Sequence, residues 1–202
     1  DSGKSSVAIQ SMKAALEQGC GVIYAETENK TTEKDLKAWG VDPTQVIIVS
    51  SQIAEELYEL LFTTWDSYHS VFPDKPLLVI VDSIGNLISL RDEEIDLMEQ
   101  NSQPGGKGKA NRLGISKMIS KMSQSRTAVL LISYTYENMG SVGKTTAGGQ
   151  ALHFYSSLMY QTQRKAWLER TKNGEIIRVG AKVLFTLMKN HLNKADPGAK
   201  KI

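Results

Sequence analysis

A short motif at the start of the sequence strongly constrains how the chain can fold. Gly3-Lys4-Ser5 is the usual end of a glycine-rich phosphate-binding loop (a P-loop), and the apolar run 77–81 leads directly into Asp82. In such sites the N–H groups of the loop and of a helix N-terminus hold phosphates, while an acid at the end of a buried strand serves the metal ion. Gly-Lys-Ser alone recurs by chance, but its pairing with a strand-end Asp predicts a nucleoside-triphosphate site.

Apolar periodicity predicts that strands and helices alternate along the first part of the chain. Apolar residues at helical spacing predict helices over 5–18 and 52–69 and around 115–122, and a capping box at Thr32 to Asp35 predicts a short helix. Buried strands are expected over 21–25, 46–50, 77–82 and 128–133. This alternation predicts an α/β fold with a mostly parallel, doubly wound sheet, in which ligands lie beyond the carboxyl ends of the strands.

After residue 158 the pattern changes to two long β-rich runs. They cover 158–170 and 175–188, and an Asn-Gly pair at 173–174 lies between them. Asn-Gly is a strong hairpin signal because a type I′ turn needs positive φ at both of its central positions. We therefore expect an antiparallel β-hairpin that extends the parallel sheet.

Two segments lack regular periodicity and are expected to be loops. They span 91–112 and 137–150, are rich in glycine, and each follows a strand on the predicted ligand-binding edge. Loops of this length inside a compact domain are usually functional or disordered.

Composition limits the class of protein. A chain of 202 residues that is 41% hydrophobic can form one large domain, expected over 1–192 with a polar tail over 193–202. A net charge of +2 gives no bulk attraction to nucleic acid, so any such contact must come from local patches. The single cysteine, Cys20, is typical of a reducing compartment, and no apolar run approaches the roughly 18 residues of a membrane span. We expect a cytoplasmic protein without membrane contact.

Together these residues resemble the RecA recombinase family, and within it the phage recombinases of the UvsX type. Segment 81–87 resembles the family's metal-binding strand and its exit, 145–156 resembles the end of the second DNA-binding loop with the helix after it, and 188–191 resembles a strand that ends in paired basic residues. The likeness covers nearly the whole chain in order. It implies a P-loop NTPase core of the RecA type that uses ATP and Mg²⁺.

The resemblance assigns roles to residues around the nucleotide. Lys4 would bind the β- and γ-phosphates, Ser5 the Mg²⁺, and Asp82 the Mg²⁺ through water. An ungapped count from Lys4 puts the family's water-activating carboxylate at Glu28, and a small gap would move that role to Glu26. The expected nucleotide-binding positions are Asp1, Ser2, Gly3, Lys4, Ser5 and Ser6.

Three further residues correspond to positions that couple hydrolysis to assembly in this family. Tyr134 follows the fourth predicted strand, where the family has a Gln or His that senses the γ-phosphate. Lys189 and His191 match two basic residues that reach the ATP of a neighbouring protomer. His191 replaces a residue that is usually permanently charged, so trans activation is expected to be weaker or pH-dependent.

The two irregular segments correspond to the family's DNA-binding loops. Lysine and arginine side chains neutralise phosphates, and glycine N–H groups can donate to them. The expected contacts are Lys107, Lys109, Asn111 and Arg112 in the first loop, and Asn138, Met139, Ser141, Lys144, Thr145, Thr146, Gly148 and Gly149 in the second.

The resemblance implies a DNA-dependent ATPase, the core of a recombinase that binds single-stranded DNA and pairs it with homologous duplex DNA in recombination and repair. Filament formation would need the family's N-terminal polymerisation segment, which is expected upstream of residue 1, so the 202 residues alone are expected to be mainly monomeric. Tyr134 and His191 depart from the family pattern and leave open a nucleotide-binding accessory protein or regulator. A DnaB-like helicase core, which shares the fold, is a third hypothesis.

Overall fold

The computed structural model describes residues 3–28, 30–93, 106–137, 144–147, 150–172 and 174–192. The chain forms two compact units, one spanning Ala8–Tyr155 and one that combines Asp1–Val7 with Ser156–Ile202. The expected polar tail, 193–202, lies outside the described residues.

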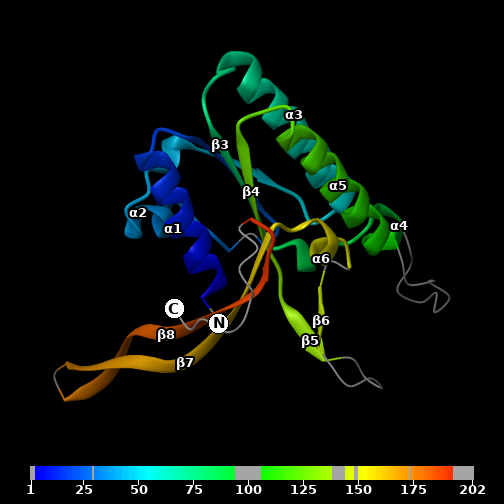
Figure 1. The fold of residues 1–202 in the computed structure, drawn as a ribbon. Helices are drawn as coiled ribbons and strands as arrows, with labels where there is room; N and C mark the ends of the chain where they lie inside the picture. Colours follow the sequence, from blue (N-terminus) through cyan, green and yellow to red (C-terminus); the bar gives the residue numbers. More distant parts are fainter. Residues whose placement is uncertain are drawn as a thin grey trace. The chain divides into compact units, whose positions relative to one another are not determined.

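A four-stranded parallel sheet forms the centre of the first unit (Figure 1). The strands are β1 (Gly21–Glu26), β2 (Val46–Ser50), β3 (Leu77–Asp82) and β4 (Thr127–Ile132), in the order β2-β1-β3-β4. All four predicted strands are confirmed to within a residue at each end. Every residue of β1 is buried, as expected for a central strand covered on both faces.

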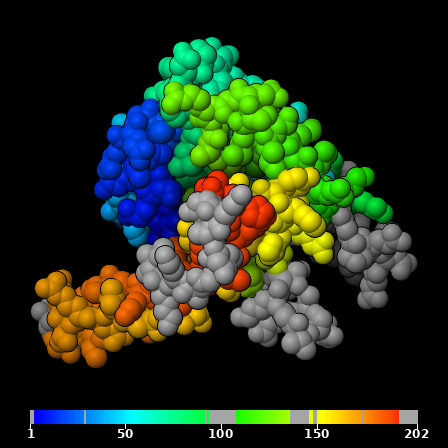
Figure 2. Space-filling model, viewed as in Figure 1, coloured from blue at the N-terminus to red at the C-terminus, as the bar shows by residue number. Residues whose placement is uncertain are grey.

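Helices cover both faces of this sheet (Figure 1). The helices α1 (Lys4–Glu17) and α2 (Glu33–Ala38) pack on one face, where they meet Val22 and Tyr24. The other face carries Ile23 and Ala25 and packs against α3 (Ala54–Val71) and α5 (Gly106–Met122). Alternate residues of β1 thus enter two separate cores. The α5 helix forms much of the green surface in Figure 2.

The predicted capping box of α2 is confirmed. Thr32 Oγ1 accepts the N–H of Asp35 at 3.2 Å, and the Asp35 carboxylate accepts the N–H of Thr32 at 2.9 Å. The Thr32 hydroxyl also donates to the Asp35 carboxylate, and this hydrogen bond, followed by that of the Thr32 N–H, lowers the pKa of Asp35. A short 3₁₀ turn, η1 (Pro43–Gln45), follows and leads into β2.

The prediction of an irregular segment over 91–112 is partly wrong, because α5 begins at Gly106 rather than near Ile115. The buried stripe of this helix continues toward its N-terminus through Gly114 and Asn111. Tyr58 of α3 donates its hydroxyl to Asn111 Oδ1 at 3.0 Å, and its ring lies against Gly114. The stripe was missed because its first members are polar or small. The short α4 helix (Leu90–Glu93) precedes residues that lie outside the described part.

The second segment expected to be irregular, 137–150, also contains regular structure. Strands β5 (Thr135–Glu137) and β6 (Lys144–Thr146) pair antiparallel, and α6 (Ala151–Tyr155) follows them. Residues 138–143 and 148–149 lie outside the described residues. Among the described helices, none has the length and apolar character needed to cross a membrane.

The second unit contains the predicted β-hairpin. Strands β7 (Leu158–Lys172) and β8 (Glu175–Asn190) pair antiparallel, and Gly174 in the turn has a φ of +82°. The hairpin is confirmed, but the expectation that it extends the parallel sheet is wrong: among the described residues, β7 and β8 form a separate two-stranded sheet. Each strand bonds along its length to the other, which satisfies the hairpin's inner backbone groups without the larger sheet.

Candidate nucleotide site

Two acids meet at the carboxyl edge of the parallel sheet. Glu26 ends β1 and Asp82 ends β3, and the two residues are paired in register. Glu26 is 5% exposed and Asp82 is 8% exposed. The Tyr24 hydroxyl donates to Asp82 Oδ2 at 3.4 Å and lies 3.1 Å from Thr31 Oγ1. Burial raises the pKa of Tyr24, and the negative charges of Asp82 and Glu26 raise it further, so the hydroxyl stays a donor.

A reciprocal pair of hydrogen bonds joins β1 to β3 just beyond these acids. Thr27 Oγ1 donates to the carbonyl of Ser83 and accepts the N–H of Ser83, each at 3.0 Å. The N–H of Thr27 also donates to the carbonyl of Asp82 at 3.0 Å. Both side chains are buried, so the exits of the two strands are fixed to each other.

The two candidate carboxylates, Glu26 and Glu28, differ in their surroundings. Glu26 Oε1 accepts the N–H of Glu28 at 3.2 Å and the N–H of Lys30 at 3.1 Å, so this buried side chain holds the turn after β1. Glu28 lies in that turn, and 28% of its side chain is exposed. Its carboxylate accepts a hydrogen bond from Asn86 Nδ2 and pairs with Lys30 Nζ.

Asn86 belongs to the 3₁₀ turn η2 (Ile84–Asn86), which follows β3. Sequence reasoning assigned no role to Asn86, to Lys30 or to the Thr27–Ser83 pair. The available signal was a polar residue, Asn86, three positions beyond Ser83, inside the segment that carries the family resemblance. Only the fold brings Asn86 to Glu28, because the two lie on the exits of neighbouring strands.

Tyr134 lies beside η2. Its hydroxyl donates to the carbonyl of Gly85 at 3.2 Å, and its own carbonyl accepts the N–H of Ala147 at 2.8 Å. A Cβ on Gly85 would lie 2.5 Å from Tyr134 Cε1, so only glycine fits here. Ser133 Oγ donates to the carbonyl of Ala147 as well. Tyr134 thus connects η2 to the residues that follow β6.

The residues expected to form the phosphate loop lie at the start of α1, in the second unit. Lys4 is the first residue of the helix, Ser5 and Ser6 follow in its first turn, and the carbonyl of Gly3 accepts the N–H of Val7 at 3.1 Å. Gly3 has a φ of +81°, a conformation that favours glycine. Asp1 and Ser2 lie outside the described residues.

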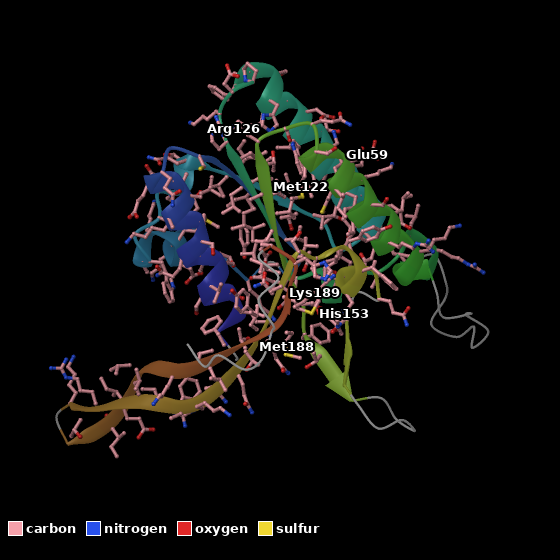
Figure 3. The ribbon with its side chains drawn as sticks, viewed as in Figure 1. Glu59, Met122, Arg126, His153, Met188 and Lys189 are labelled. Carbon is pink, nitrogen blue, oxygen red and sulfur yellow. The ribbon has the colours of Figure 1, made fainter. Side chains whose placement is uncertain are left out.

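The two basic residues expected to act in trans lie at the end of the hairpin. Lys189 lies near the end of β8, opposite Met159 of β7 (Figure 3). His191 follows the strand, and its N–H donates to the carbonyl of Ser157 at 2.9 Å.

The expected DNA-binding residues fall on regular elements or outside the described residues. Lys107, Lys109 and Arg112 lie on α5 rather than in a loop, and the side chains of Lys109 and Arg112 are exposed. Asn111 is fully buried against Tyr58 and is therefore not available to a nucleic acid. Lys144, Thr145 and Thr146 form strand β6, whereas Asn138, Met139, Ser141, Gly148 and Gly149 lie outside the described residues.

An open groove of about 670 Å³ lies at the opposite, amino-terminal edge of the sheet. Its lining includes Cys20, Leu77 and Arg126, and Arg126 lies in the turn before β4 (Figure 3). Ligands of doubly wound sheets bind at the carboxyl ends of strands, so this groove is not the candidate nucleotide site.

Comparison with known proteins identifies the family of the chain. The profile of the RecA N-terminal domain matches residues 1–198. Protein RecA of Malacoplasma penetrans is 26% identical over 189 residues, which cover 92% of this chain and 54% of that protein. Protein RecA of Mesoplasma florum is 27% identical over 192 residues, covering 94% and 54%, and the plasmid-encoded Protein RecA of Lactococcus lactis subsp. lactis is 26% identical over 197 residues, covering 95% and 53%. The chain spans about half the length of these curated relatives, and it belongs to the RecA family through its match to the RecA N-terminal domain.

Proposed function

We propose that the chain is the ATPase core of a DNA-dependent recombinase. The observation that carries the proposal is the carboxyl edge of the sheet, where Asp82 and Glu26 are paired in register and the partly exposed Glu28 follows. An acid at the end of β3 and a second carboxylate beyond β1 are the groups that hydrolysis of a nucleoside triphosphate requires.

The chemistry of these side chains fits ATP·Mg²⁺. Asp82 offers the hard oxygen ligands that Mg²⁺ prefers, and Ser5 offers a hydroxyl at the start of α1. Among the described residues, no group of three or more His, Cys, Asp or Glu could hold a metal ion. Mg²⁺ would therefore take most of its ligands from the nucleotide and water, with Asp82 acting through water. Bound ATP·Mg²⁺ would supply the γ-phosphoryl group, and Lys4 would bind its phosphates.

We assign activation of the attacking water to Glu28 rather than Glu26. Glu26 is buried, and its Oε1 accepts two backbone N–H groups, so movement toward a substrate would break the turn that it holds. In the contacts described above, the Glu28 carboxylate binds the side chains of Asn86 and Lys30 rather than backbone groups. A substrate or water molecule can replace such side-chain contacts without breaking the turn. General base help of this kind contributes typically ~10²–10⁴-fold to a rate.

DNA is the proposed partner. The exposed Lys109 and Arg112 on α5, and the segment around β6, would neutralise phosphates of single-stranded and duplex DNA. We propose that Lys189 and His191 act in trans at the ATP of a neighbouring protomer in a filament. We also propose that the chain is most similar within its family to phage recombinases of the UvsX type, through segments 81–87 and 145–156, and that it acts in the cytoplasm of a bacterium or a phage-infected cell.

The decisive measurement is ATP hydrolysis with and without single-stranded DNA, on the protein with any natural flanking sequence retained. We expect strong stimulation by DNA that is lost in Glu28→Ala and kept in Glu33→Ala, an exposed acid on α2 that serves as the matched control. Glu26→Ala is expected to lower stability as well as activity. Hydrolysis that persists in Glu28→Ala, or that ignores DNA, would contradict the proposal.

A second candidate function, a nucleotide-binding regulator, is favoured by Tyr134. The Tyr134 hydroxyl donates its hydrogen bond to the Gly85 carbonyl at 3.2 Å, so this proton is not directed at a phosphate. Tight ATP binding and DNA binding without stimulated turnover or strand exchange would support this function over the recombinase.

A further inference from the structure

We propose that Asn86 positions the carboxylate of Glu28 and that Lys30 restrains the same carboxylate until it is displaced. This inference rests on the proposed function and deepens it, because it names the residues that control when Glu28 acts. Each oxygen of the Glu28 carboxylate has its own partner. Glu28 Oε1 accepts the hydrogen bond of Asn86 Nδ2, and Glu28 Oε2 pairs with Lys30 Nζ.

The Asn86 side of this arrangement is anchored in the fold. Asn86 Nδ2 also donates to Ser83 Oγ at 2.9 Å, and the Asn86 N–H donates to the carbonyl of Ser83 at 3.3 Å. Ser83 is 3% exposed and is bound reciprocally to Thr27. A neutral amide therefore holds Glu28 Oε1 from the same hydrogen-bonded unit that joins β1 to β3. An amide fixes the direction of a carboxylate without removing its negative charge.

The Lys30 side is exposed and therefore exchangeable. The Lys30 side chain is 76% exposed, whereas that of Glu28 is 28% exposed. The hydrogen bond and charge of Glu28 raise the pKa of Lys30, so the ammonium stays protonated at neutral pH. An ion pair this exposed contributes little to stability, since water and salt compete for both partners. A DNA phosphate or a nucleotide phosphate could therefore take Lys30 away at small cost.

The contacts of Asn86 and Lys30 with Glu28 predict opposite effects on ATP turnover when either residue is removed. While Lys30 holds Oε2, that oxygen is not free to orient a water molecule for attack on phosphorus. Once Lys30 leaves, Asn86 keeps Oε1 fixed and Oε2 faces the solvent side of the turn. Loss of Asn86 should slow turnover, whereas loss of Lys30 should raise turnover in the absence of DNA.

The first test measures turnover and nucleotide affinity separately. In Asn86→Ala we expect kcat to fall by about 10- to 100-fold, the scale of a small misplacement of a reacting group, while the Kd of a fluorescent ATP analogue stays within about twofold. The near-isosteric Asn86→Asp should lose at least as much kcat, because two carboxylates would then face each other. An unchanged kcat, or a Kd weakened as much as kcat, would overturn the role of Asn86.

The second test concerns Lys30. We expect Lys30→Met to raise DNA-independent hydrolysis several-fold and to reduce the ratio of stimulated to basal rate, with Lys37→Met on α2, another exposed lysine in an ion pair, as the matched control. Equal or lower basal hydrolysis in Lys30→Met would overturn the restraint.

A third measurement separates this inference from the proposed function. Thermal unfolding without nucleotide is compared for Glu28→Ala, Asn86→Ala and the double variant. We expect the double variant to lose less in Tm than the sum of the two single losses, because the second change removes a partner that is already absent. Additive losses would overturn the Glu28–Asn86 contact. If the unmodified protein hydrolyses no ATP, the proposed function fails, and this cycle still decides the contact.

Discussion

Strands β1 and β7 occupy opposite environments. All six residues of β1 are buried between parallel neighbours, whereas only Met159 and Thr162 of β7 are even half-buried. The polar groups at the end of β1 are therefore fixed by many partners, and those of β7 by its single partner β8. Precise placement of candidate reacting groups thus comes from the covered sheet, while the hairpin depends on its own cross-strand contacts.

The hairpin carries a cluster in which two arginines contact Trp167. The guanidinium carbon of Arg164 lies 4.2 Å from the centroid of the Trp167 ring, and that of Arg178 lies 4.7 Å from it. The register of β7 with β8 shifts between Arg164 and Ala166, beside this cluster. A two-stranded sheet has little stability of its own, so such pairs are expected to matter locally.

The largest expected effect contrasts two tryptophans. Trp65 of α3 is 1% exposed in the core, whereas Trp167 is 37% exposed on the hairpin. Trp65→Ala should lower the free energy of unfolding by about 3–5 kcal/mol through the cavity that it leaves, and Trp167→Ala by about 1 kcal/mol. Urea unfolding followed by circular dichroism measures both. Similar losses would contradict the division between covered sheet and exposed hairpin.

A second contrast lies within α5. A Cβ on Gly114 would lie 2.4 Å from the Tyr58 ring, whereas a Cβ on Gly108 meets nothing within 4 Å. Gly114→Ala should therefore cost about 1–3 kcal/mol of stability by overpacking, although alanine favours helices. Gly108→Ala should stabilise by about 0.5 kcal/mol. Chemical denaturation of both variants checks this, and a stabilising Gly114→Ala would show that Tyr58 can move aside.

The sheet region should also respond to alkaline pH. Burial raises the pKa of Tyr58 and Tyr24 above the ordinary value of 10.0. The folded state therefore keeps both phenols protonated where the unfolded chain releases the protons. Their contribution to stability is complete below about pH 10 and decreases as the pH rises beyond it. Unfolding measured at pH 8 and at pH 11 should show this decrease, and Tyr58→Phe should reduce it. An unchanged pH dependence in that variant would contradict the assignment.

The smallest expected effect belongs to the hairpin cluster. Arg178→Ala removes one cation from Trp167 and its 3.9 Å contact with Glu169. We expect a loss of about 0.5–1 kcal/mol, since both partners are exposed. Arg170→Ala, which changes an exposed arginine on the neighbouring strand β7, serves as the control. A loss comparable to that of Trp65→Ala would mean that the hairpin is as tightly constrained as the sheet.

The elements that were predicted well have patterns contained in adjacent residues. The strands of the sheet are apolar runs, α2 carries its capping box at Thr32, and the hairpin carries Asn-Gly at its turn. The start of α5 was missed because its inward-facing residues are Asn111 and Gly114, which become part of a buried stripe only through Tyr58, far away in the sequence. The hairpin was predicted, but its separation from the parallel sheet was not, because the pairing of strands depends on tertiary contacts rather than on a strand's own pattern.

The residues of the candidate site also differ in whether the sequence alone could predict them. Asp82 and Glu26 could be predicted because strand-end acids of neighbouring parallel strands meet at one edge. Asn86 could not, since nothing in its local sequence indicates Glu28 as a partner. The nucleotide and DNA roles of the named residues stay predictions that the experiments above address.

The contact between Gly85 and Tyr134 restricts how the protein can vary. A side chain at position 85 would occupy the space of the Tyr134 ring, and a smaller residue at 134 would leave the Gly85 carbonyl without its hydroxyl donor. The two positions should therefore change together among homologues and in engineered variants. The Gln or His that the resemblance implies at position 134 would alter the packing and the hydrogen bond at Gly85, so we expect the two positions to be constrained together.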